Sequence, residues 1–270
     1  MDEKKKVIRT GVAIIIVLVV IAAAYYFFIA GKGKKTGPGE QTLQTQKLPG
    51  EESAGKEGKS IPAISTELDK SDEVVRKLIA ELSSNSAFGQ WLKSKNLVRK
   101  FVAAVDNIAN GQSPRPHMDF FTLNKEFKAI LKNGRTYLDP SSYERYNIIA
   151  DVFDSVSVAG CVRLYEGFKP LFQQAYRELG YPKEDFHQTL LKAIVEICKT
   201  PVVDQPIALE KKVTTYVMVD PKLEQLSPAQ KHLLRMGPEN LQLIQAKLRE
   251  IALALGFADA QLPKQKTPTR

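Results

Sequence analysis

The residues best suited to chemistry are tyrosines and arginines that gather between positions 137 and 181. Tyrosine offers a rigid ring with a polar hydroxyl, and arginine offers a fixed fork of hydrogen-bond donors, so both residue types are enriched at binding hot spots. The simpler interpretation, which we favour, is that the phenols lie half-buried at the margin of a core with their hydroxyls hydrogen-bonded. The set comprises Tyr137, Tyr143, Arg145, Tyr146, Arg163, Tyr165, Tyr176, Arg177 and Tyr181.

Carboxylates offer acid–base chemistry as the alternative. Asp151 and Asp154 are three residues apart and would share a helix face, although two solvated side chains are the default interpretation. An enzyme acting on cell-wall or lipid material could use Asp106 or Glu178 as an acid together with Arg145. The sequence contains no G-x-S-x-G motif that would place a nucleophilic serine. We therefore assign no catalytic residue and keep enzymatic activity as the second hypothesis.

The sequence also lacks metal and cofactor signatures. His117, His187 and His232 are too dispersed for a local metal motif, and neither H-E-x-x-H nor a paired C-x-x-C occurs. The glycine- and lysine-rich segment 31–37 lacks the spacing of a phosphate-binding loop. We predict no metal and no cofactor.

Cys161 and Cys198 are the only cysteines, and each lies among apolar neighbours. A free cysteine in such a setting commonly behaves as a small buried hydrophobic residue. A disulfide becomes possible if the domain is exported, but its geometry cannot be read from sequence. We therefore predict buried free thiols, with a disulfide between the two cysteines as the alternative.

The formal charge of +9 looks typical of nucleic-acid binding until it is divided along the chain. Residues 1–35 carry seven Lys or Arg and two Asp or Glu. Residues 67–256 carry 26 Lys or Arg against 23 Asp or Glu, a net charge of +3. The excess lies mainly near the N-terminus, so a nucleic-acid partner is not predicted.

The elements that must position these side chains begin with an apolar segment. Gly11 to Gly31 is a run of 21 residues without a charged or amide side chain. As a helix it would be roughly 31 Å long, enough to cross the hydrocarbon core of a bilayer. We interpret it as an uncleaved anchor, because a signal peptide has a shorter apolar region and a small-residue cleavage site. Four Lys or Arg precede it and three follow closely, which slightly favours a cytoplasmic N-terminus, residues 1–10.

A tether and a folded domain are expected after the anchor. Residues 32–66 are rich in Gly, Lys, Glu, Ser and Pro and nearly empty of large apolar residues, which predicts a disordered linker. For residues 36–66, flexible-chain scaling gives a root-mean-square reach of about 30 Å. The soluble domain is expected over 67–256, and a flexible tail over 257–270.

Apolar spacing in the first part of the domain is that of helices. A helix is expected from 72 to 82 with Ser71 as its N-cap, and a second, short one from 87 to 93. Residues 96–111 have apolar side chains at three- and four-residue steps, with Gly111 as a stop.

The pattern becomes helical again after residue 140. One helix is expected to about residue 156, and a second over 161–180 with a kink or break at Pro170. A third should cover 183–199. Near the C-terminus, Ser227 caps a short helix, and Pro238 starts a longer one whose apolar stripe we interpret as a core face rather than a coiled-coil seam.

Two segments have the character of strands. The dipeptide Asn133-Gly134 lies between extended runs within 126–138 and predicts a hairpin whose turn needs positive φ. Residues 212–219 indicate a third strand that could join it. The expected fold class is mostly α, with one N-terminal transmembrane helix, a disordered tether and a helical domain carrying a small antiparallel β element.

Four blocks of sequence carry a family resemblance. They are VAAVDNIANG at 102–111, YERYN at 143–147, KPLFQQAYRELGYP at 169–182 and the run from 219 to 251. Together they resemble the bacterial domain of unknown function 3014, over roughly residues 67–255. The resemblance implies an N-terminal span, a polar linker and an envelope setting, but no activity or ligand. Motif positions that become candidates for a polar network or binding surface are Asp106, Asn107, Arg145, Tyr146, Tyr176, Glu178, Tyr181, Lys231, Arg235 and Asn240.

We expect a single-pass protein of the bacterial inner membrane whose domain lies in the periplasm and binds another envelope component as an adaptor or assembly factor. Its partners would be the membrane, through residues 11–31, and an envelope protein. The anchor, the reach of the tether and the lack of a catalytic motif favour this hypothesis. A cytoplasmic domain that recruits a soluble protein remains the hypothesis for the reversed orientation.

Overall fold

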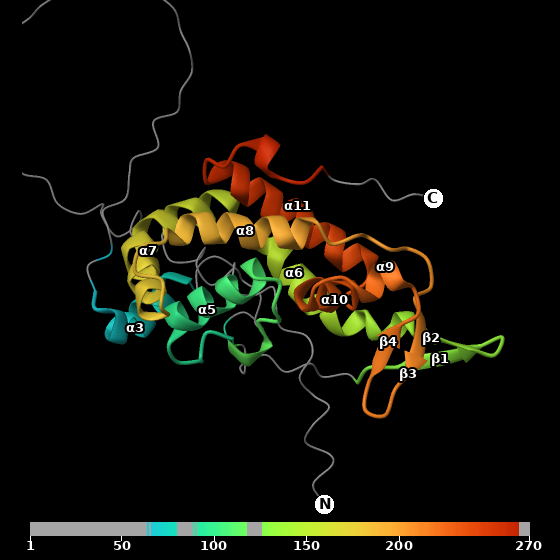
Figure 1. The fold of residues 1–270 in the computed structure, drawn as a ribbon. Coiled ribbons are helices and arrows are strands. Elements are labelled where there is room, and N and C mark those ends of the chain that lie inside the picture. The colour runs from blue at the N-terminus through green and yellow to red at the C-terminus, as the bar shows by residue number, and fades with distance from the viewer. Residues whose placement is uncertain (1–63, 65, 80–88, 90, 118–125, 265–270) are drawn as a thin grey trace, which may run out of the picture.

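The computed structural model describes residues 64, 66–79, 89, 91–117 and 126–264, which form a mostly helical body with a small antiparallel sheet at one end (Figure 1). The predicted span 11–31 and nearly all of the predicted tether lie outside these residues. No helix in the part of the chain that the structure describes is both long and apolar enough to cross a membrane.

Four long helices build the body. They are α5 (Leu97–Ala109), α7 (Val158–Glu178), α8 (Phe186–Cys198) and α11 (Pro238–Ala254). Helix α8 lies between α5 and α11 and packs on both, while α6 (Asn147–Ser155) packs on α11 (Figure 1). Aromatic rings fill the centre, where Phe101 lies 5.2 Å from Phe172 and 5.6 Å from Phe186 between ring centroids.

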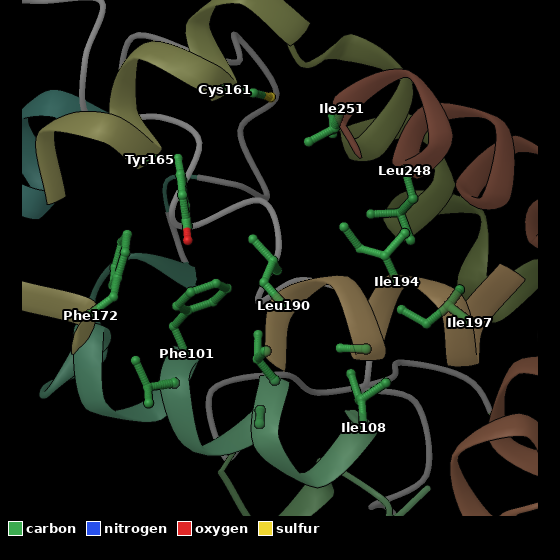
Figure 2. Close-up of a cluster of buried hydrophobic side chains, with 14 of the residues drawn as sticks. Phe101, Ile108, Cys161, Tyr165, Phe172, Leu190, Ile194, Ile197, Leu248 and Ile251 are labelled. Carbon is green, nitrogen blue, oxygen red and sulfur yellow. The ribbon is translucent and has the colours of Figure 1, made fainter. Parts of the chain in front are cut away.

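The apolar stripes predicted on α5 and α11 are confirmed as core faces. Figure 2 shows Phe101 and Ile108 of α5 on one side of α8, and Leu248 and Ile251 of α11 on another. Burying side chains of this size contributes about 1.5–3 kcal/mol each. The further buried members of the two stripes are Val98, Val105, Leu241 and Ile244.

The first helix of the domain differs from its prediction. Helix α3 (Ser71–Ile79) follows a 3-10 turn, η2 (Leu68–Lys70). Ser71 lies inside the helix, and its hydroxyl donates to the Leu68 carbonyl at 2.7 Å, so it is not an N-cap. The end predicted at 82, and positions 87, 88 and 90 of the helix predicted over 87–93, lie outside the described residues. Trp91 and Leu92 are buried as expected.

Asp72 of α3 caps the neighbouring helix α5. Its carboxylate accepts hydrogen bonds from the backbone nitrogens of Asn96 at 2.7 Å and Leu97 at 2.8 Å. Asn96, whose φ is 57°, makes no side-chain cap of its own. A carboxylate at a helix N-terminus satisfies its free donors and complements its dipole, so Asp72 fixes α3 to α5.

The sheet has four antiparallel strands in the order β1-β2-β3-β4. They are β1 (Ala129–Lys132), β2 (Arg135–Leu138), β3 (Ala208–Lys211) and β4 (Tyr216–Met218). The first hairpin is confirmed, because Asn133 and Gly134 have φ of 50° and 73°. The single strand predicted over 212–219 is wrong in extent: its first residues form the turn of a second hairpin, where Val213 is fully exposed, and β3 precedes them.

The helix predicted from 140 to 156 is divided in the structure. Two 3-10 turns, η4 (Pro140–Ser142) and η5 (Glu144–Tyr146), precede α6. The Asp139 side chain accepts from the backbone nitrogen of Ser141 at 2.9 Å and starts the first turn. The tighter turns bring two neighbouring side chains, Arg145 and Tyr146, into the interior.

Pro170 does not break α7, which runs without interruption from Val158 to Glu178. Proline cannot donate to the Glu166 carbonyl four residues earlier. Both residues are exposed, so water can occupy the place of the missing bond. One turn away, the Gly167 carbonyl accepts a hydrogen bond from the backbone nitrogen of Ile64 at 3.0 Å.

The C-terminal part contains α9 (Pro221–Glu224) and α10 (Pro228–Leu234) before α11. Ser227 caps α10 as predicted, in a reciprocal capping box with Gln230. The first residues of the tail predicted from 257 pack on the domain. Phe257 and Leu262 are buried in the core, and they flank η6 (Asp259–Gln261). Arg249 holds this segment by donating to the Pro263 carbonyl at 2.8 Å.

Candidate functional site

The structure brings four of the ten candidate residues together around η5 and α10. Arg145 is only 8% exposed, and Tyr146 is fully buried. The Arg145 Nη2 donates to the Tyr146 hydroxyl at 3.0 Å, and the guanidinium lies 4.8 Å from the Tyr146 ring centroid. The ring of Phe127, 5.6 Å away, flanks it as well. Among the described residues, the cation is thus held by a phenol hydroxyl and by the attraction of two aromatic faces.

Helix α10 contributes Lys231, His232 and Arg235, all half-buried. Burial lowers the pKa of Arg235, and the charge of Arg145 lowers it further. Lys231 forms an ion pair with Glu224 at 2.8 Å between Nζ and Oε1. That bond lowers the pKa of Glu224, whose other oxygen accepts from the Met218 backbone nitrogen at 2.8 Å.

A third arginine, Arg115, comes from the 3-10 turn η3 (Arg115–His117), which packs against α5. Its charge acts on Tyr146, as do those of Arg145 and Arg235, although burial dominates and raises the pKa of that tyrosine. Burial, together with the charges of Arg235 and Arg115, lowers the pKa of His232 to about 4. At neutral pH the group is therefore three arginine cations beside a neutral histidine. We call Arg115, Arg145 and Arg235 the arginine group.

Asn107 and Asn240 form hydrogen bonds with segments next to the arginine group. Asn107 donates to the Ser113 carbonyl at 3.2 Å, and the Ser113 hydroxyl lies 3.1 Å from Nδ1 of His232. Asn240 donates to the carbonyl of Tyr143 at 3.3 Å and to Oδ1 of Asn147 at 3.0 Å, which fixes α11 to the turn carrying Arg145. Both asparagines thus connect segments that are distant in the sequence or adjacent in a turn to the elements around the arginine group.

A second polar cluster forms where α5 meets the end of α7. The Asp106 carboxylate accepts from the Tyr181 hydroxyl at 3.3 Å and from the Asn110 side chain at 3.1 Å. Burial raises the pKa of Asp106, although these two hydrogen bonds act in the opposite direction. The rings of Tyr176 and Tyr181 stack with their centroids 4.6 Å apart. The Tyr176 hydroxyl accepts from Thr189 at 3.0 Å.

Glu178 belongs to neither group. It is exposed on the last turn of α7 and accepts from Arg99 at 2.8 Å. The acid pair suggested for an enzyme, Asp106 or Glu178 with Arg145, is therefore distributed over three places, each with its own partners. Asp151 and Asp154 are exposed, in keeping with solvated carboxylates.

Sequence reasoning missed Arg115, His232, Ser113 and Glu224 as members of the site. The three histidines are dispersed along the chain, so the sequence gives no sign that His232 belongs to a site. Arg115 lies between two prolines in a segment without periodicity. No sequence signal pairs these residues, because folding brings together positions more than 100 residues apart, such as Ser113 and His232.

Over the described ranges, no group of three or more His, Cys, Asp or Glu residues could hold a metal ion. Cys161 and Cys198 are free thiols. Burial raises the pKa of Cys198 to about 11 and raises that of Cys161 as well, so both are poor nucleophiles at neutral pH.

The fold and the site define a mostly helical domain with a four-stranded antiparallel sheet and a buried arginine group. The chain matches the family described as "Protein of unknown function (DUF3014)" over residues 97–252, more than half of its length, and it belongs to that family. The match confirms the resemblance over a shorter range than the 67–255 expected. No curated protein and no solved structure was found to match the chain.

Proposed function

We propose that the protein is a single-pass, membrane-anchored binding module of the bacterial cell envelope, with its domain in the periplasm. The apolar run 11–31 supports the anchor, and the polar composition of 32–66 supports a tether that lets the domain reach a partner. The slight excess of basic residues before the run supports the orientation.

The arginine group is the observation that favours a binding function over a catalytic one. Its neighbours do not exchange protons near neutral pH, because the pKa of Tyr146 is raised and that of His232 is lowered to about 4. A general acid or base works best with a pKa near the working pH. Fixed cations of unchanging charge are suited to holding a ligand rather than to transferring a proton.

An envelope enzyme is the second candidate, and Asp106 favours it. Its raised pKa and its contact with the Tyr181 hydroxyl are features that a buried acid would need. Asp106→Asn keeps the hydrogen-bond acceptor but loses the acid. If this variant failed to complement a deletion strain while Glu178→Gln complemented it, at equal protein levels, the enzyme would become the better proposal.

Crosslinking in living cells tests the binding function. The full chain and a shortened chain ending at residue 63 would each carry the same affinity tag, and each would be crosslinked and purified from membranes. We expect an envelope protein that is recovered with the full chain and lost with the shortened one. Recovery of the same proteins with both chains would contradict a binding role for the domain.

A further inference from the structure

We propose that the arginine group is an oxyanion-binding site, which takes a carboxylate or phosphate group of the ligand. This inference names the chemistry of recognition and rests on the binding function proposed above. Arg145 is its buried member, and Arg235 is half-buried.

The first support is an unsatisfied donor. Arg145 is more than nine-tenths buried, yet its Nε–H has no hydrogen-bond acceptor among the described residues. Buried donors in folded proteins are nearly always paired, because leaving one unpaired sacrifices its hydration without a replacement. The unpaired N–H is part of the donor fork that binds planar and tetrahedral oxyanions.

The second support is the imbalance of charge. The cations of Arg145 and Arg235 are close enough for the first to lower the pKa of the second. Glu224 is the carboxylate that acts on Arg235, but it already binds Lys231 and the Met218 backbone nitrogen. A second negative charge beside the two arginines would offset their repulsion in a poorly solvated place.

The third support is the rigidity of the Arg145 fork. The Tyr146 hydroxyl fixes its Nη2, and two aromatic rings lie within 6 Å of the guanidinium carbon. Tyr143, on the same turn, is held against Gly237 at the start of α11, and its carbonyl receives the Asn240 side chain. A fork fixed before binding loses little conformational entropy when the anion arrives.

The test measures anion binding by the purified full chain in detergent. Thermal unfolding is followed in sodium phosphate, sodium acetate and sodium chloride at equal ionic strength and pH 7. We expect phosphate or acetate to raise the unfolding temperature in a saturable way that chloride does not reproduce. A larger effect of phosphate would indicate a phosphate-bearing ligand, and a larger effect of acetate a carboxylate.

Arg235→Gln is the decisive variant, because the Arg235 side chain is half-buried and is not a member of the hydrophobic core. The substitution should lower the affinity for the anion at least about tenfold, which is the loss expected when a hydrogen bond to a charged group is removed. Arg135→Gln removes the same charge from the exposed β1–β2 hairpin and should bind like the parent chain. Arg145→Lys, which keeps the charge but loses the fork, should also bind more weakly.

An equal effect of the three salts, or the same anion effect in Arg235→Gln and the parent chain, would overturn the inference. The crosslinking experiment is independent of this result. A specific envelope partner without an anion effect would leave the binding function standing and reject only the oxyanion site. A saturable anion effect without a specific partner would support the oxyanion site and reject the proposed envelope partner.

Discussion

A single histidine on α10 makes the acid stability of the domain predictable. The pKa of His232 falls from its ordinary value of 6.5 to about 4 on folding, because of burial and the charges of Arg235 and Arg115. Between these two values the unfolded chain binds the proton and the folded chain does not, so stability falls as pH falls from 6.5 to 4. The loss amounts to about 3 kcal/mol at pH 4 and is absent above pH 6.5.

His232→Gln should remove most of this acid sensitivity. Denaturant unfolding of the parent chain and the variant at pH 7 and pH 4.5 gives the difference in the free energy of unfolding. His187→Gln is the comparison variant: burial also lowers the pKa of His187, but less strongly, so this variant should remove less of the acid sensitivity. His187 lies against Phe257 and outside the arginine group. An unchanged pH dependence in His232→Gln would show that His232 does not stay neutral in the folded protein.

The junction between α10 and α11 shows how closely elements can approach. Gly237 has a φ of 86°, and a Cβ built on it would lie 2.5 Å from Cγ of Tyr143. Gly237→Ala therefore combines backbone strain with a steric overlap against the turn that carries Arg145. We expect a loss of about 3 kcal/mol in the free energy of unfolding.

Gly256→Ala measures the cost of a positive φ without the overlap. Gly256 has a φ of 88°, nearly the same as Gly237, but a Cβ there would meet nothing within 4 Å. This control should lose only the strain of the left-handed backbone, about 1 kcal/mol. Equal losses in the two variants, measured by denaturant unfolding, would mean that Tyr143 moves aside without cost.

Elements were predictable where local spacing decides them. The stripes of α5 and α11, the Asn133-Gly134 turn and the Ser227 cap depend on residues a few positions apart. Strand β3 was missed because its four residues, ALEK, carry little β-propensity, and pairing with β2 and β4 makes it a strand. The Asp72 cap also depends on a distant contact, because its carboxylate accepts from a helix that begins 25 residues later.

At the scale of the molecule, the sequence could name some of the site residues but not arrange them. Arg145, Tyr146, Lys231 and Arg235 came from motif positions, and the fold places them in one group with Arg115. Asp106 and Glu178 came from the same motifs and lie elsewhere with partners of their own. Contacts between positions 75 or more residues apart follow from packing of the helical body, which no local pattern specifies.

The orientation of the whole chain decides which partner can reach this site. We predict that a single cysteine at Ser53, in the predicted tether, reacts in intact cells with a maleimide that stays outside the cytoplasm. The native thiols would be removed first, with Cys161→Ala because that residue lies in the core, and with Cys198→Ser. Labelling before lysis would support a periplasmic domain and direct the search to envelope ligands. Labelling only after lysis would reverse the orientation, and the anion bound by the arginine group would then have to be cytoplasmic.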